Sequence, residues 1–203
     1  MTKLSEAKIY GGIGALLSIL GIVPYAGPLL GLIGLVLIFI AVKQIADETK
    51  NHKIFNDYLM NFILQIVAVV ALIIIVIVAF GISGGLTWAT SLSQQNITDF
   101  NSFWNIFGTI ITGAIIGLVI AWILLVIGAF FLRKSYNNIA EHTKVNLFKT
   151  TGTVYFIGAI TLIIIVGLLI LFVAKILEIV SFFSLPDNLP QTSEVSKTET
   201  SAS

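Results

Sequence analysis

The chain has 203 residues, of which 57% are hydrophobic and 10% are charged. Soluble domains carry about a quarter charged residues, so this composition excludes an ordinary soluble globule and indicates a chain surrounded by lipid. Its 11 basic and 10 acidic residues give a formal net charge of +1, which offers no field to attract nucleic acid. Because the chain has no cysteine, disulfides, thiolate nucleophiles and cysteine-bound metals are excluded as well.

The first apolar block, residues 9–42, is interrupted by Pro24, Gly27 and Pro28. A proline inside a helix loses a hydrogen bond and clashes with the preceding turn, so one straight helix is excluded. We favour a tight hairpin of two helices, about 9–23 and 26–46, with Pro28 in the first turn of the second. The apolar parts of the two arms, residues 9–23 and 26–42, are then only roughly 22 to 26 Å long, short for a full crossing. A re-entrant pair or one kinked helix is the alternative.

Three longer apolar blocks follow, over residues 58–83, 103–132 and 150–174, and none of them contains Asp, Glu, Lys, Arg or His. Each exceeds the ~20 residues that cross a bilayer as a helix. The blocks do not alternate with period two, which favours helices over barrel strands. We therefore predict helices over about 57–83, 103–138 and 148–183. Residues 1–184 form one all-α integral membrane helical bundle of five crossings, followed by a disordered Ser/Thr-rich tail over 185–203.

Basic residues are concentrated in two of the predicted loops: Lys43, Lys50 and Lys53 in the first, and Arg133, Lys134, Lys144 and Lys149 in the second. The loop over 84–102 has none. Short loops rich in Lys and Arg stay in the cytoplasm, so we expect a multi-pass protein of the cell membrane with both basic loops inside. Five crossings then place the N-terminus in the cytoplasm and the C-terminal tail outside the cell.

The two basic loops contain similar segments, Ile45-Ala46-Asp47-Glu48-Thr49-Lys50 and Ile139-Ala140-Glu141-His142-Thr143-Lys144. Two similar amphipathic helix ends at a cytoplasmic interface explain this similarity more simply than an ancestral duplication, which remains the alternative.

Small residues recur at helical spacing, which lets helices approach closely in lipid. In the fourth predicted helix the stripe contains Gly113 and Gly117, and in the second it contains Gly27, Gly31 and Gly34. We interpret Gly113, Gly117, Gly27 and Gly31 as helix-packing positions; the alternative is the lining of a pore or ligand cleft. The first helix carries Gly11, Gly14, Ser18 and Gly21 at similar intervals.

A polar stripe of Asp57, Asn61 and Gln65 opens the third predicted helix. An amide buried in hydrocarbon needs a hydrogen-bond partner. The favoured interpretation of the intramembrane residues Asn61 and Gln65 is hydrogen bonding to another helix, through Ser18, Thr112 or Thr161. The alternative is the wall of a vestibule or a cation site.

Other motifs are weak. Asn96-Ile97-Thr98 is a glycosylation sequon in the loop that we place outside the cell. The two histidines, His52 and His142, lie in the basic loops and make a poor metal site, so we expect no metal, no cofactor and no catalytic residue.

The segment KIYGGIGALLSILGIVPYAGPLLGLIGLVLIFIAVKQIAD, residues 8–47, has a distinctive order of features. A glycine-rich segment is followed by a Pro-Tyr-Ala-Gly-Pro break, a second glycine-rich helix and an Ile-Ala-Asp end. It resembles the archaeal and bacterial membrane family called domain of unknown function 996. The resemblance implies a multi-pass membrane protein, archaeal and of unassigned activity, with no catalytic residues to carry over.

Active transport normally requires ionisable residues inside the membrane, and the three long apolar blocks have none. An enzyme would need a nucleophile or an acid/base pair at depth. We therefore expect a non-catalytic structural or accessory subunit that acts through helix packing, with the lipid bilayer and a homo-oligomer or larger membrane complex as partners. A passive channel or small-solute carrier is the alternative.

Overall fold

The computed structural model describes residues 2–21, 23–82, 100–164 and 166–190, and the regular structure in these ranges is entirely helical. The helices are α1 (Lys3–Leu20), α2 (Gly27–Glu48), α3 (His52–Ile82), α5 (Phe100–Thr143), α6 (Leu147–Thr161) and α7 (Val166–Phe183). Four of them are long and apolar enough to cross a membrane: α2, α7 and the portions 52–78 of α3 and 111–143 of α5. The predicted class, an integral membrane helical bundle, is confirmed.

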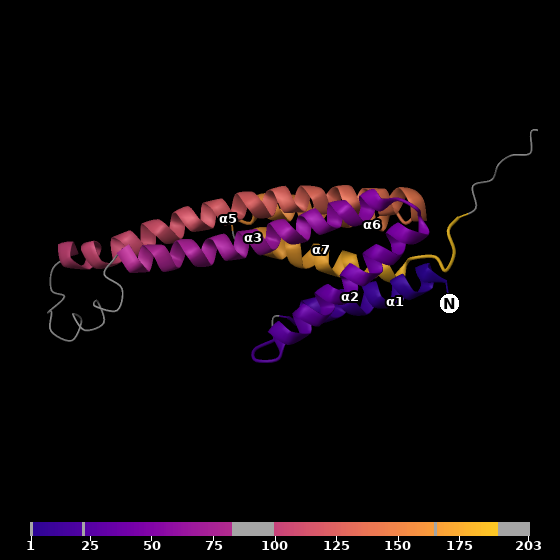
Figure 1. Ribbon diagram of the computed structural model, residues 1–203, viewed down its shortest axis with the longest axis horizontal. Helices are drawn as coiled ribbons and strands as arrows, with labels where there is room; N and C mark the ends of the chain where they lie inside the picture. The colour runs from indigo at the N-terminus through magenta and orange to yellow at the C-terminus, as the bar shows by residue number, and fades with distance from the viewer. Residues whose placement is uncertain (1, 22, 83–99, 165, 191–203) are drawn as a thin grey trace, which may run out of the picture.

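The bundle consists of one long antiparallel pair and two shorter hairpins (Figure 1). Helices α3 and α5 form the long pair, and the hairpins α1–α2 and α6–α7 pack beside one end of it. At 1.5 Å per residue, the 44 residues of α5 extend about 66 Å. The 15 residues of α6 extend only about 22 Å. The α3–α5 pair therefore continues well past the turns of both hairpins.

The predicted single helix over 148–183 is wrong, because α6 ends at Thr161 and α7 begins at Val166. The two helices pack antiparallel, with Thr151 Oγ1 2.9 Å from Ser181 Oγ. Gly167 permits the tight turn, since a Cβ at this position would lie 2.3 Å from the Cα of Leu162. Hydropathy could not reveal this turn, because the described residues in it are as apolar as the helices that it joins.

This extra hairpin returns the chain to the end at which it began. The Thr2 hydroxyl donates to the backbone oxygen of Asp187, and Lys8 Nζ lies 3.9 Å from the Asp187 carboxylate. The described start of the tail therefore lies beside the N-terminal residues at one end of the bundle, which disagrees with the expectation that the tail and the N-terminus are on opposite sides of the membrane. Leu185 is also buried, so the start of the predicted disordered tail is packed against the bundle, while residues 191–203 lie outside the described residues.

The two similar segments adopt the same local structure. Lys50 and Lys144 occupy equivalent positions and both have positive φ, 52° and 61°. One residue earlier, the hydroxyls of Thr49 and Thr143 each donate to the backbone oxygen four residues before them, at 2.7 and 2.8 Å. The similarity is thus a repeated helix end and turn, and it extends beyond a shared amphipathic composition.

Glycines set the distance between α1 and α2. A Cβ at Gly34 would lie 2.5 Å from the backbone oxygen of Gly14, and a Cβ at Gly14 would lie 2.7 Å from that of Gly34. A Cβ at Gly27 would lie 2.4 Å from the backbone oxygen of Gly21, whereas at Gly31 the nearest atom would be 3.4 Å away. The backbones of α1 and α2 thus touch without intervening side chains.

The fourth predicted helix, now α5, has looser glycine contacts. A Cβ at Gly117 would meet the side chains of Ile75 and Leu72 on α3 at 3.2 and 3.3 Å. Gly113 is half-buried. Side chains can shift by tenths of an ångström where backbone cannot, so Gly117 is more tolerant of substitution than Gly14 and Gly34.

We predict that Gly34→Ala destabilises the protein by about 1 to 3 kcal/mol, because the new methyl group meets the immovable backbone of α1. The midpoint of thermal unfolding in detergent measures this loss. Gly31→Ala on the same helix is the matched control and should leave the midpoint unchanged. Equal midpoints for the two variants would show that α1 and α2 do not make this contact.

We also predict that the two ends of the chain and both basic turns share one side of the membrane. The chain lacks cysteine, so single cysteines at Lys3, Lys50, Lys144 and Asn188 each provide the only thiol. All four cysteines should give the same result with a membrane-impermeant maleimide. Either none of them is labelled in intact cells and all are labelled after lysis, or all of them are labelled in intact cells. Opposite labelling at Lys3 and Asn188 would contradict the α6–α7 hairpin.

Candidate functional site

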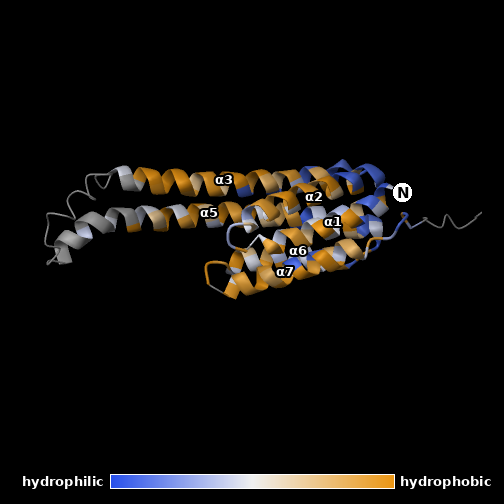
Figure 2. Cartoon of the chain, turned by 90° about the horizontal axis from the view of Figure 1, so that it is seen from below, coloured by the Kyte–Doolittle hydropathy of each residue, from blue (hydrophilic) through white to orange (hydrophobic). Residues whose placement is uncertain are grey.

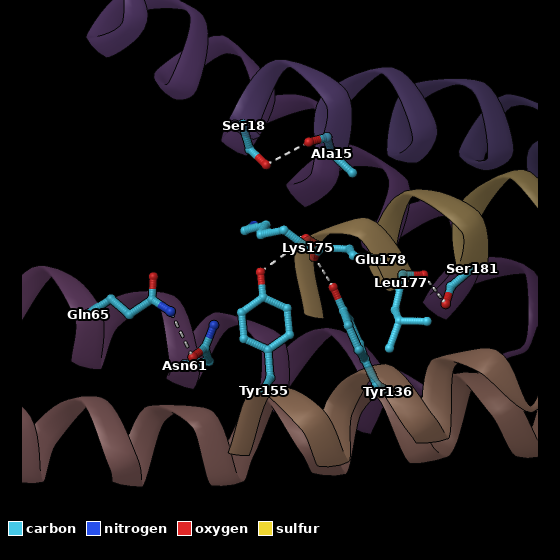
Figure 3. Close-up of polar contacts among 10 residues, drawn as sticks. All are labelled: Ala15, Ser18, Asn61, Gln65, Tyr136, Tyr155, Lys175, Leu177, Glu178 and Ser181. Atoms are coloured by element: carbon cyan, nitrogen blue, oxygen red, sulfur yellow. Dashed lines mark hydrogen bonds and ion pairs between the residues drawn. The ribbon is translucent and has the colours of Figure 1, made fainter. Parts of the chain in front are cut away.

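A carboxylate lies at the centre of the bundle. Glu178 of α7 is only 2% exposed. Its Oε1 accepts a hydrogen bond from the Tyr136 hydroxyl, and its Oε2 accepts from the Tyr155 hydroxyl at 3.2 Å and from Lys175 Nζ at 2.8 Å. Figure 3 shows these side chains converging from α5, α6 and α7. A buried charge is tolerated when it is paired and hydrogen-bonded, and both conditions hold here.

Aromatic packing fixes one of the donors. The ring of Tyr136 meets the edge of Phe148 at a centroid distance of 5.5 Å, and Phe148 in turn meets Phe182 at 5.1 Å. All three side chains are fully buried. The Tyr136 hydroxyl is therefore held in place by its surroundings, and the carboxylate that it contacts is held with it.

The ammonium group beside the carboxylate is less confined. Lys175 lies one helical turn before Glu178, and 33% of its side chain is exposed. Its Nζ lies 5.4 Å from the centroid of the Tyr155 ring, within the range of a cation–π interaction. The four-carbon stem of lysine is flexible, so this ammonium can move while the carboxylate stays fixed.

Lys175 and Glu178, which we call the charged pair, line a cavity of about 270 Å³. Each of the helices in the described part of the chain contributes to its wall. The lining residues are Ser18, Gly31, Leu35, Ile38, Tyr58, Asn61, Gln65, Leu132, Tyr155, Lys175 and Glu178. The cavity combines polar groups with an apolar wall, as small-molecule sites do.

The predicted intramembrane residues Asn61 and Gln65 both line this cavity. Gln65 Nε2 donates to Asn61 Oδ1 at 3.2 Å, so the two amides pair along α3 (Figure 3). The Ser18 and Thr161 hydroxyls donate to backbone oxygens of their own helices. Among the described residues the bond between these amides runs along α3, and the expected bonds to Ser18, Thr112 or Thr161 on another helix are not found.

The charged pair itself escaped the sequence interpretation. The apolar block that we delimited ends at Ala174, so Lys175 and Glu178 fall just beyond it, although within the predicted helix over 148–183. The structure places both inside α7, which continues to Phe183. The argument that the spanning helices lack ionisable groups is thus wrong for α7. The available signal was a Lys and a Glu three residues apart with apolar residues on both sides.

The remaining candidates lie away from this site. His142 Nδ1 is 2.8 Å from the backbone oxygen of Asn138, and its Nε2 is 3.5 Å from the Asn51 amide, at the basic end of the bundle. Within the described ranges, no group of three His, Cys, Asp or Glu residues could hold a metal ion. The sequon at Asn96 lies outside the described residues.

Fold and site together define a multi-pass helical membrane protein with an ionisable pocket inside the bundle. The chain belongs to the family described as protein of unknown function (DUF996), whose model matches residues 30–176. It is 40% identical over 192 residues to an uncharacterized protein of Methanocaldococcus jannaschii, an alignment that covers 92% of this chain and 96% of the relative. No solved structure matches the chain. The resemblance found in residues 8–47 is confirmed.

We predict that Tyr136→Phe lowers the free energy of unfolding by about 1 to 3 kcal/mol, because it removes a buried donor from a charged acceptor. The loss should be much smaller when Glu178 is already Gln, since an uncharged amide oxygen is a weaker acceptor. Unfolding in detergent measures both. Tyr10→Phe, at a side chain that is 39% exposed, is the control and should have little effect. Equal losses in the two tyrosine variants would contradict the assigned hydrogen bond.

Proposed function

We propose that the protein is a non-catalytic membrane carrier that binds a small polar solute in the pocket beside Glu178. The observation that carries this proposal is the buried carboxylate, which is 2% exposed inside a helix of otherwise apolar character. Ionisable residues inside membrane helices are costly, and they mark substrate or ion pathways by default. An open aqueous pore would wet this carboxylate, so its burial favours a binding pocket over a passive channel.

The repeated segments add support. When the two segments are aligned on Lys50 and Lys144, Ile38 corresponds to Leu132 and Asn61 corresponds to Tyr155. All four of these residues line the cavity. In transporters built from internal repeats, the substrate site commonly lies between the repeats. The position of the cavity agrees with that arrangement.

The volume limits the class of solute. Small-molecule sites usually measure about 300 to 1,000 Å³, and the cavity of about 270 Å³ lies just below that range. A solute of a few non-hydrogen atoms is accommodated, whereas a nucleotide or a lipid is not. The Ser18 hydroxyl in the cavity wall donates to the backbone oxygen of Ala15 and not to a base, so it is not arranged as an activated nucleophile.

A structural or accessory subunit that acts through helix packing is the second candidate, and the tight glycine contact between α1 and α2 is the observation that favours it. Because this contact lies within one chain, it supports helix packing as a role but does not by itself require another subunit. A homo-oligomer or a larger membrane complex is compatible with either candidate, as is glycosylation at Asn96.

We further propose that the basic end of the bundle faces the cytoplasm and that the protein resides in the cell membrane. Figure 2 shows hydrophilic residues gathered at the end where the N-terminus, the α2–α3 turn and the α5–α6 turn meet. Lys50, Lys144 and Lys149 lie in or beside these turns. The positive-inside rule then assigns this end, with the N-terminus, to the cytoplasm.

We predict that at least one class of small polar solute raises the thermal midpoint of the purified protein, since a ligand that binds only the folded state stabilises it. The panels are amino acids, amines, carboxylic acids and neutral polyols or amides. Gln65→Leu should abolish the shift while the unliganded protein remains folded, and proteoliposomes should take up the stabilising solute. The control is Gln44→Leu, since Gln44 does not line the cavity.

Two results would contradict the carrier. One is that no panel stabilises the protein. The other is that stabilisation persists in Gln65→Leu, which would place the binding elsewhere. Purification at fixed stoichiometry with a larger membrane complex, together with the first result, would favour the accessory subunit.

A further inference from the structure

The charge of the pocket restricts its ligand further. Among the described residues that line the cavity, only Lys175 and Glu178 carry charge, and their charges cancel. A ligand with a net charge would leave one uncompensated charge in a site of low dielectric constant, which is costly. A ligand without net charge avoids this penalty.

The charged pair also supplies a partner of opposite charge for a positive group and for a negative group on one ligand. Glu178 Oε2 already binds an ammonium group, that of Lys175, at 2.8 Å beside the Tyr155 ring. A ligand ammonium in the same place would meet the same carboxylate and the same ring face. The displaced Lys175 ammonium would then need an anion, and a carboxylate on the same ligand provides one.

The two partners differ in mobility in the way that such a ligand requires. Glu178 is held by the hydroxyls of Tyr136 and Tyr155, while a third of the Lys175 side chain is exposed. Lysine can therefore withdraw by the width of a ligand head group without disturbing the carboxylate. Beyond the pair, Leu35 and Ile38 offer an apolar wall for a short side chain.

From these contacts we infer that the pocket binds a zwitterion of the α-amino acid type, whose ammonium replaces Lys175 Nζ at Glu178 and whose carboxylate pairs with Lys175. This inference rests on the proposed carrier function and names the substrate class of the same site. The Lys175–Glu178 ion pair is then the closed form of the empty pocket.

The test uses three matched panels on the full-length protein in detergent: α-amino acids, the amines that result from removing their carboxylate, and the carboxylic acids that result from removing their ammonium. A fourth panel holds neutral polyols and amides. The readouts are the thermal midpoint and the half-saturating concentration. We expect at least one amino acid to bind at least tenfold more tightly than its own amine and its own acid.

Two substitutions should change the preferred class in opposite directions. In Lys175→Met only Glu178 remains charged, so the amine should bind at least tenfold more tightly than its amino acid. In Glu178→Gln only Lys175 remains charged, so the carboxylic acid should be preferred. Lys175→Arg keeps the positive charge, so this variant should still bind the amino acid more tightly than its amine and its acid. Lys149→Met and Glu141→Gln, at exposed side chains, are the matched controls.

The outcomes separate this inference from the proposed function. Wild-type binding of amines, acids or neutral solutes in place of amino acids would overturn the zwitterion and leave the carrier intact. Binding in none of the four panels would overturn the carrier itself. Gel filtration and helical circular dichroism establish whether each variant is folded. A folded Lys175→Met that still prefers the amino acid would also overturn the inference.

Discussion

The need to satisfy one buried carboxylate organises the centre of this protein. Glu178 is only 2% exposed, so its hydrogen-bond donors must come from neighbouring side chains and not from water. Tyr136 of α5, Tyr155 of α6 and Lys175 of α7 meet that need, and in doing so they join three helices at one point. Elsewhere in the bundle neighbouring helices associate through apolar contacts, with pairwise hydrogen bonds such as that between Thr151 of α6 and Ser181 of α7.

The second organising contact is the backbone approach of α1 and α2, and it uses opposite chemistry. Gly14 and Gly34 allow the two helices to touch because they lack side chains. The resulting hairpin is narrow, and its inner face carries Ser18 and Gly31 to the pocket. The glycine contact and the charged cluster thus both shape the same cavity. The glycines do so because they have no side chains, and the cluster does so through its polar side chains.

The sequence predicts much of this fold because apolar runs and prolines are local signals. The break at Pro24 to Pro28 and the long helices around residues 58–82 and 103–132 all follow from them. The turn between α6 and α7 does not, since it depends on the close contact of Gly167 with Leu162 across four apolar residues. Because the residues of this turn are as apolar as the flanking helices, the hydropathy of the sequence predicts one continuous helix here.

The candidate site divides in the same way. Asn61 and Gln65 are visible as amides in an apolar run, and the structure brings both to the cavity. The cluster around Glu178 is not visible in the sequence, because its donors Tyr136 and Tyr155 look like ordinary interfacial aromatics until α7 lies beside them. Glu178 was overlooked for a related reason: its residue type, at the edge of an apolar block, is also what a solvated helix end contains.

The unequal lengths of the helices have a mechanical consequence for the bilayer. Trp122 of α5 donates to the backbone oxygen of Ala159 near the end of α6, which marks where the α6–α7 hairpin stops along α5. Beyond that level α5 continues with exposed Ile111 and Ile115, accompanied by α3. The six helices of the described part lie together at the basic end, whereas only α3 and α5 continue beyond the α6–α7 turn (Figure 1). The described part of the protein is therefore wider at its basic end, and in a bilayer this shape takes up more area in the leaflet on that side than in the opposite one.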